Sequence, residues 1–442
     1  MSTMPFNQTA SGEDKFPNLT GDDLAVGIDL GTTNSVVSFW SNEKLRAKVI
    51  KVEGSNKTLP SVVAFEKDGR KWKPCVGRAA VERGATNPAS CVRNVKRLMG
   101  QQYDSPAVEK LLEEGTDSYE ILPLPKGDVE DSERPSKLKV EINDQDTAYR
   151  LFPEEVSACI LTHLKTMVEL YLKDKQVVRF AVITVPAHFN HSQRLATLEA
   201  AHVAGFEDAR ILSEPTAAAI AYGLGVAGEK NVFVFDLGGG TFDTSILHIQ
   251  EGNIDVLSTL GDPRLGGNDV DAMILSYALK TLALRALKNV DDDGLKPSTV
   301  SAAPESMTIT ELYTFLGLTS TSPAFVEIQR ACEHAKIELT RKDKTYIVLE
   351  GIRGDLKFPV DSVTERAKAN INIPLSQKQL EEMMVPFLAK CKCIVEQALL
   401  DVDMAAKDID EIVLVGGVTR MPAVYSMVQS IFPGKVLCKS IN

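Results

Sequence analysis

Two short loops, each between two apolar strands, carry the residues best suited to chemistry. One reads Asp-Leu-Gly-Thr-Thr at 29–33, and the other reads Asp-Leu-Gly-Gly-Gly-Thr-Phe-Asp at 236–243. Glycines let a backbone turn sharply and approach a bulky anion, because no Cβ shields their N–H groups. Acids beside such a phosphate cradle make sense when a hydrated Mg²⁺ lies between protein and phosphate. A tight hairpin is the alternative, but it gains nothing from two acids and a threonine, so the loops favour a metal–nucleotide site.

The two loops share one plan, which predicts two similar lobes that face one nucleotide. The continuous apolar runs Phe180–Pro186 and Ile412–Val415 are typical of buried strands that would support them. Pro153 and the two glutamates after it predict the start of a helix, and Pro386 should interrupt a helix that begins at Lys378. Residues 102–148 are rich in acids, prolines and glycines and indicate a surface loop with one strand.

Composition narrows the class of protein. The chain has 442 residues, of which 44% are hydrophobic and 25% charged, which is enough for two domains with cores. The formal net charge of −11 argues against a nucleic-acid partner. The seven cysteines are scattered and lack the paired spacing of a zinc site. With no apolar run of signal-peptide or membrane-spanning length, we expect a cytoplasmic protein that contacts no membrane.

Five motifs in order resemble the ATPase domain of the heat-shock protein 70 chaperones. They are the two loops, Ser213–Ala219, Leu265–Gly267 and Val415–Arg420, and the similarity covers 24–442. The resemblance implies an α/β, actin-like fold of two lobes, each built on a mixed five-stranded sheet with flanking helices, with nucleotide in the cleft between them. We expect a disordered polar tail at 1–23, lobe I at 24–225 and lobe II at 226–442, with no peptide-binding domain.

The resemblance also implies roles for individual residues. Lys96, Glu214, Asp236 and Asp243 match the catalytic residues, and Asp29 and Asp236 match the acids that hold Mg²⁺ through water. The residues that match the family's ATP or ADP contacts are Thr32, Thr33, Gly238, Gly239, Gly240, Thr241, Gly267, Glu333, Lys336, Thr340, Gly416, Gly417 and Arg420. Lys96 taken alone would be a solvated surface lysine, but the frame Lys-Arg-Leu with a following glycine matches the family.

Two histidines depart from the family pattern. His188 and His191 stand where tyrosine and aspartate are more usual. Their spacing could imitate a metal site, but we expect both to be exposed loop residues. The resemblance implies J-domain co-chaperones and nucleotide-exchange factors as partners of a monomer, and Arg210 matches a J-domain contact.

Three functions remain to be compared. The first is a Mg-ATP-binding, slowly hydrolysing chaperone-type ATPase core that assists protein folding or its regulation. The second is a nucleotide-gated binding module with little turnover, and the third is a small-molecule kinase of the wider superfamily. The intact set of Lys96, Glu214, Asp236 and Asp243 favours the first over the second, and the lack of an evident sugar pocket disfavours the third.

Overall fold

The computed structural model describes residues 23–42, 44, 46–69, 71–114, 119–123, 138–144, 147–173, 176–223, 228–251, 253–292, 303–352, 356 and 371–438. The polar tail expected at the N-terminus lies outside these residues except for Asp23. Within the described part of the chain, no helix combines the length and the apolar composition needed to cross a membrane.

The first sheet is built around the first loop. Its main path runs in the order β12 (Asp208–Ser213), β11 (Val177–Val185), β1 (Asp23–Leu30), β2 (Asn34–Ser41) and β3 (Arg46–Val49), with the short β4 (Leu59–Pro60) beside β2. Strands β1, β11 and β12 are parallel, while β1, β2 and β3 form an antiparallel meander. The first loop therefore lies at the β1–β2 turn.

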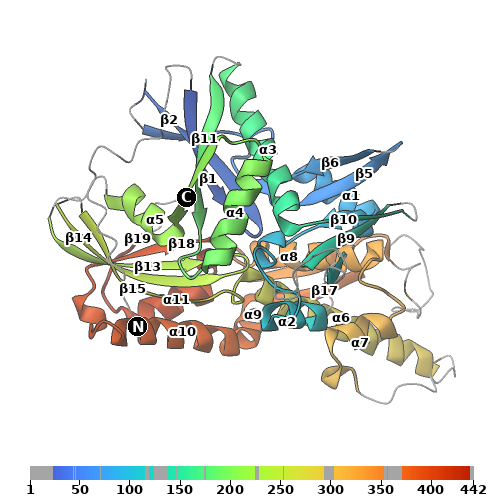
Figure 1. Ribbon diagram of the computed structural model, residues 1–442. Helices are drawn as coiled ribbons and strands as arrows, with labels where there is room; N and C mark the ends of the chain where they lie inside the picture. The colour runs from blue at the N-terminus through green and yellow to red at the C-terminus, as the bar shows by residue number, and fades with distance from the viewer. Residues whose placement is uncertain are drawn as a thin grey trace.

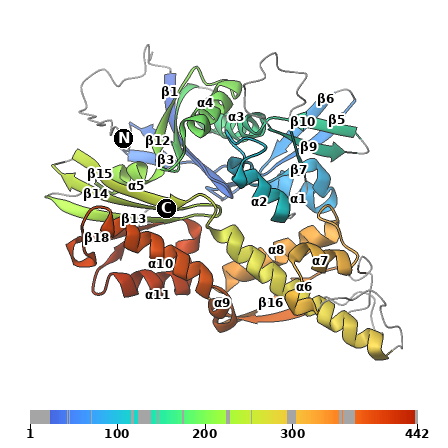
Figure 2. The ribbon, with the colours of Figure 1, turned by 60° about the horizontal axis from the view of Figure 1, so that its bottom comes forward.

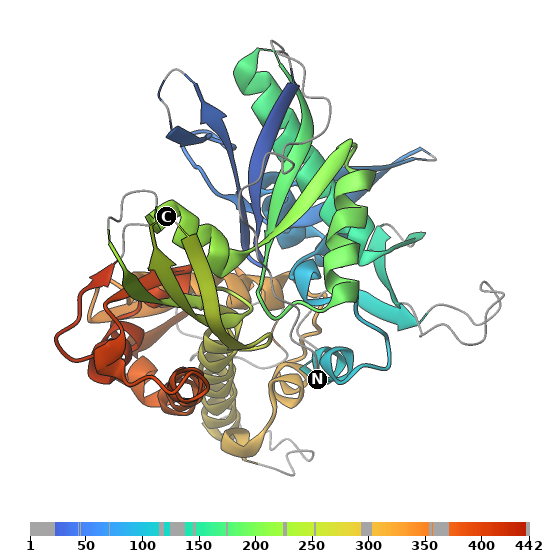
Figure 3. The same ribbon diagram turned by 60° about the vertical axis from the view of Figure 1, so that its left-hand side comes forward.

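The second sheet repeats this plan around the second loop. Its order is β15 (Asn253–Asp262), β14 (Phe242–Gln250), β13 (Lys230–Leu237), β18 (Glu411–Val415) and β19 (Leu437–Cys438). Strand β13 pairs antiparallel with β14 and parallel with β18, as β1 pairs with β2 and β11. The two sheets form separate bodies, the first above the second in Figure 1, and Figure 3 shows them from another side.

Each sheet has its own apolar core. In lobe I, α3 (Pro153–Leu172) and α4 (His191–Val203) pack together and against β11. In lobe II, α10 (Val385–Leu400) and α11 (Pro422–Ile431) lie side by side under the sheet (Figure 2). Helix α5 (Glu214–Gly223) follows β12, yet Ala218 and Ala219 are buried against β13 and β14. This helix links the two bodies, and the division of the chain at 225 remains a proposal.

The expected surface loop at 102–148 was wrong for the part that the structure describes. It contains α2 (Pro106–Glu114) and the strands β8 (Glu120–Pro123) and β9 (Leu138–Asp144), and β9 also pairs with β10 (Thr147–Leu151). Val140 and Ile142 are fully buried on either side of a glutamate. This period of two predicts a half-buried strand, but the acids, prolines and glycines around it obscured the pattern.

Smaller elements extend each lobe toward the right of Figure 1. In lobe I, the sheet β6 (Lys71–Val76), β5 (Val63–Asp68), β7 (Cys91–Val92) packs with α1 (Arg78–Thr86). In lobe II, the extension comprises α6 (Gly267–Asp292), α7 (Ile309–Phe315), α8 (Pro323–Glu338), the hairpin β16 (Lys344–Leu349) and β17 (Ile371–Ser376), and α9 (Gln377–Met383). Helices α1 and α8 meet across the lobes. The prediction for Pro386 is confirmed, because α9 ends at Met383 and the proline lies in the first turn of α10.

The turn after β18 generates a first prediction. Gly416 has a φ of +87°, and a β-carbon added there would lie 2.2 Å from the carbonyl oxygen of Leu237. We expect Gly416→Ala to lower the free energy of unfolding of the empty protein by about 2–4 kcal/mol, because strain and overcrowding add. A β-carbon at the neighbouring Gly417 would meet no atom within 4 Å, so Gly417→Ala is the matched control. Equal urea midpoints for the two variants would contradict this account.

Candidate functional site

The two glycine loops touch each other across the gap between the lobes. A β-carbon on Gly239 would lie 1.9 Å from Thr33 Oγ1, and one on Gly240 would lie 2.8 Å from Thr32 Cγ2. Glycine is required at both positions because each loop approaches the hydroxyl residues of the other lobe this closely. The site predicted from sequence is therefore built from both lobes at once.

Residues 265–268, at the start of α6, form a third loop that is hydrogen-bonded to the second one. The N–H of Gly267 donates to Gly238 O at 3.0 Å, and the N–H of Asn268 donates to Gly239 O at 2.8 Å. Asn268 also reaches lobe I, since its Nδ2 donates to Asn94 Oδ1 at 3.0 Å. The start of α6 thereby holds the glycine turn in place.

One lysine and four carboxylates converge at the loops. Lys96 lies in the short 3-10 helix Val95–Arg97 and donates to Glu214 Oε1 at 2.8 Å. The two side chains are only 9% and 15% exposed. Asp236 and Asp243 are directly paired across β13 and β14. Asp29 is the next-to-last residue of β1, and its charge acts on Lys96 and Glu214. The structure thus brings the sequence-predicted catalytic and metal-binding residues together.

Burial raises the pKa of three carboxyl groups in this cluster, those of Asp29, Glu214 and Asp236. Desolvation is the largest cause for Glu214 and Asp236, and the neighbouring carboxylates raise the pKa of both further, so that Asp236 lies well above its ordinary value. Asp29 keeps contact with solvent, but the protein atoms around the cleft still desolvate it and raise its pKa. Desolvation alone would lower the pKa of Lys96, yet Glu214, Asp29 and Asp236 outweigh it and raise the pKa.

His188 is not the exposed loop residue that we expected. Its Nδ1 lies 2.6 Å from Asp243 Oδ1, and its side chain is 19% exposed. The expectation failed because it considered only the polar loop after β11, whereas lobe II covers this loop in the folded protein. His191 is exposed as expected, but it lies at the start of α4 instead of in a loop.

Of the residues assigned to the adenosine contacts, Gly267 and Lys336 lie together at the start of α6. Lys336 Nζ on α8 lies 2.6 Å from Asp271 Oδ2 and 3.3 Å from Gly267 O. Glu333 also interacts with Asp271, because its negative charge raises the pKa of the Asp271 carboxyl group. Thr340 donates its hydroxyl to Ile337 O at the end of α8, and Arg420 lies exposed after the turn at Gly416 and Gly417. Asp271 is the member of this group that the motifs missed, because only the fold brings it to Lys336.

A small hollow lies where the first loop, Lys96 and the second loop meet. It has a volume of about 40 Å³ and is lined by residues that include Thr32, Lys96, Phe189 and Thr241. Sites for small molecules occupy roughly 300–1,000 Å³, so this hollow by itself is too small to hold a nucleotide.

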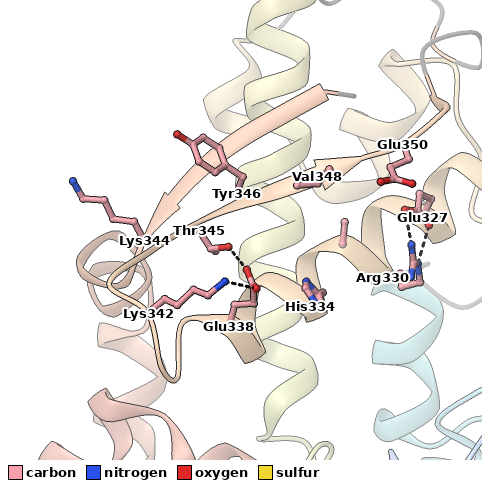
Figure 4. Close-up of a pocket in the computed structure, with 11 residues that line it drawn as sticks. Glu327, Arg330, His334, Glu338, Lys342, Lys344, Thr345, Tyr346, Val348 and Glu350 are labelled. Carbon is pink, nitrogen blue, oxygen red and sulfur yellow. Dashed lines mark hydrogen bonds and ion pairs between the residues drawn. The ribbon is translucent and has the colours of Figure 1, made fainter. Parts of the chain in front are cut away.

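A larger groove of about 540 Å³ lies elsewhere, between α8 and β16 (Figure 4). Arg330 pairs with Glu327, and Lys342 and Thr345 both bind Glu338. Glu327, Ala331, His334 and Glu338 line the groove from α8 at separations of three or four residues, so they share one face of this helix. Lys336 lies two residues from both His334 and Glu338 and therefore projects from another face. The groove is thus distinct from the site predicted by the motifs.

Comparison with known proteins identifies the family. A family model described as "Hsp70 protein" matches residues 25–307 and 314–442. The chain belongs to the Hsp70 family. Hsp70 proteins are chaperones and ATPases with the actin-like fold of two lobes, so the expected fold class is confirmed.

One relative shows how similar the chain is to a known Hsp70 protein and how much of that protein it covers. A heat shock cognate HSP70 protein from Trypanosoma brucei brucei is 36% identical over 421 residues, which are 95% of this chain and 54% of that protein. The chain thus spans about half the length of this Hsp70 relative.

The buried pair Asp271–Lys336 generates a prediction about pH. Burial is the largest cause that raises the pKa of Asp271 from 3.8 to about 6. A carboxyl whose pKa is raised on folding favours the folded state most at low pH, and this contribution is lost as the pH rises through about 6. Asp271→Asn should remove that part of the pH dependence, which amounts to at most about 3 kcal/mol.

The measurement is urea unfolding between about pH 4 and pH 8. Glu382→Gln, at a side chain that is 64% exposed on α9, controls for the loss of one negative charge. A wild-type pH profile that persists in Asp271→Asn would show that other groups cause it.

Proposed function

We propose that this protein binds Mg-ATP between its lobes and slowly hydrolyses it to ADP and phosphate, as the ATPase core of a chaperone. The observation that carries the proposal is the cluster of Lys96, Glu214, Asp29, Asp236 and Asp243, in which Lys96 and Asp243 are buried, beside glycine loops from both lobes. Such a desolvated group of acids with one lysine has an excess of negative charge, which favours a cation. The Hsp70 family supplies the reaction class.

The unsatisfied polar atoms of the site fit a hydrated metal and a phosphate. Thr33 Oγ1 and Asp243 Oδ2 are buried and have no hydrogen-bond partner among the described residues. Within the same residues, no three acids, histidines or cysteines lie close enough to hold a metal ion directly, and we propose that Asp29 and Asp236 hold Mg²⁺ through its water. When bound, the ion would neutralise charge on the phosphate oxygens.

The other candidate residues fall into two main groups, those that would contact the phosphates and those that would contact the adenosine. The phosphates would be held by Thr32, Thr33 and the turn at 238–241. Lys96 would offset the charge that develops on the transferred group. The attacking water would be oriented by Glu214 and Asp243. Gly267, Glu333, Lys336, Thr340, Gly416, Gly417 and Arg420 would surround the adenosine. We also propose J-domain proteins and nucleotide-exchange factors as partners of a cytoplasmic monomer.

Phosphate release by the purified chain tests the proposal. We expect slow release from Mg-ATP that does not increase when glucose-like acceptors are added. Tight binding without release would instead indicate a nucleotide-gated binding module. Acceptor-dependent consumption of ATP, with a phosphorylated product, would indicate a small-molecule kinase.

Lys96 should act more on the transition state than on bound ATP. We expect Lys96→Ala and Lys96→Met to lower the single-turnover rate about a hundredfold or more and to change the affinity for Mg-ATP by less than about threefold. Lys392→Ala, at an exposed lysine on α10, is the control. Melting curves must show that both variants fold, because loss of Lys96 leaves Glu214 buried without its cation. A normal rate in folded Lys96→Met would refute this role.

Asp236 should have opposite effects on binding and stability. Because desolvation and its neighbours raise its pKa well above the ordinary value, the charged form opposes folding at neutral pH. Asp236→Asn should therefore raise the melting temperature of the empty protein. It should also weaken nucleotide binding at least about tenfold with Mg²⁺ and much less in EDTA. The same loss of affinity with and without Mg²⁺ would argue against a role in metal binding.

A further inference from the structure

The contact between His188 and Asp243 joins the two lobes at the centre of the proposed site. His188 follows β11 of lobe I, and Asp243 lies near the start of β14 of lobe II. The 2.6 Å between Nδ1 and Oδ1 is a short hydrogen bond. Asp243 is 1% exposed in its side chain, so this bond is made where water cannot replace it.

His188 is the partner that orients the carboxylate. Among the described residues, the Asp243 side chain has its one hydrogen bond to His188, and its other oxygen, Oδ2, is buried without a partner. A carboxylate held at one oxygen alone can rotate about its last torsion when that bond is lost. Removal of the imidazole would thus free a group whose direction matters for catalysis.

The same short segment also contacts the lysine of the site. The ring of Phe189 lies edge-on to His188 at 5.9 Å between centroids, and Lys96 Nζ lies 5.7 Å from the centre of the Phe189 ring. Residues 188 and 189 thus contact both the acid of lobe II and the lysine of lobe I.

We propose that His188 is a positioning residue for hydrolysis: it fixes the direction of the Asp243 carboxylate through a hydrogen bond that forms when the lobes close. The neutral imidazole with its hydrogen on Nδ1 suffices as the donor, so no change of charge is needed. The proposal rests on the proposed ATPase function and adds a residue that the motifs did not assign. In this role His188 acts through Asp243 and does not itself contact the reacting atoms.

Substitution series at His188 separate positioning from packing. His188→Phe keeps an aromatic ring and removes the donor, whereas His188→Asn retains an amide N–H near the place of Nδ1. We expect the single-turnover rate of His188→Phe to fall about tenfold or more, with less than about threefold change in Mg-ATP affinity. We expect the rate of His188→Asn to lie within about threefold of wild type. His191→Phe, at the exposed start of α4, controls for the substitution itself.

A second contact between the lobes serves as a control, because its loss tests whether any weakened contact between the lobes slows hydrolysis. Arg264→Ala removes the hydrogen bond of 3.2 Å from Arg264 Nη1 to Pro106 O on α2 and leaves Asp243 and His188 in place. We expect it to change the rate by less than about threefold. The proposal is overturned if His188→Phe keeps the wild-type rate, if His188→Asn restores no more of the rate than His188→Phe, or if Arg264→Ala slows hydrolysis as much as His188→Phe.

The lobe contact can also be tested without nucleotide. Distances between labels on opposite lobes of the empty protein should lengthen in His188→Phe and in Asp243→Ala, and the double variant should show no further change. Unchanged distances in His188→Phe would overturn the closure part of the proposal. If wild type released no phosphate while these distances behaved as expected, the proposed function would fail and the lobe contact would stand.

Discussion

The balance of charge around Lys96 is the constraint on which the site depends. One buried ammonium group lies among carboxylates that repel one another, and within the described part of the chain its one hydrogen bond is to Glu214. Desolvation of such a group costs free energy that the protein recovers only when positive charge is added. The same cluster of charges that opposes folding of the empty protein therefore favours the binding of a cation.

Close approach of two backbones adds a geometric constraint to this electrostatic one. Gly239 and Gly240 leave just enough room for Thr33 and Thr32, so the cradle is complete only when the lobes are together. Contacts at His188, at Asn94 and between α1 and α8 all join the same two bodies. These contacts bring residues of both lobes together at the proposed site.

Lobe II organises its share of the site through α6. Its first turn binds the carbonyls of Gly238 and Gly239, and Asp271, one turn further along, binds Lys336 on α8. The glycine turn and the proposed adenosine contacts therefore depend on one helix. A movement of α6 would alter both together.

The sequence by itself determined the elements whose signal is local. Apolar strands ending in Asp-Leu-Gly loops, the proline at the start of α3 and the break at Pro386 all follow from chemistry within a few residues, and the ordered motifs identified the family. The strands at 138–151 were not predicted because their alternation of apolar and polar residues is short and surrounded by polar residues. Tertiary structure alone decided that His188 meets Asp243, that Asn268 meets Asn94 and that Asp271 meets Lys336. The members of each pair lie far apart in the chain, and no periodicity or spacing encodes which side chains the packing of helices and lobes brings together.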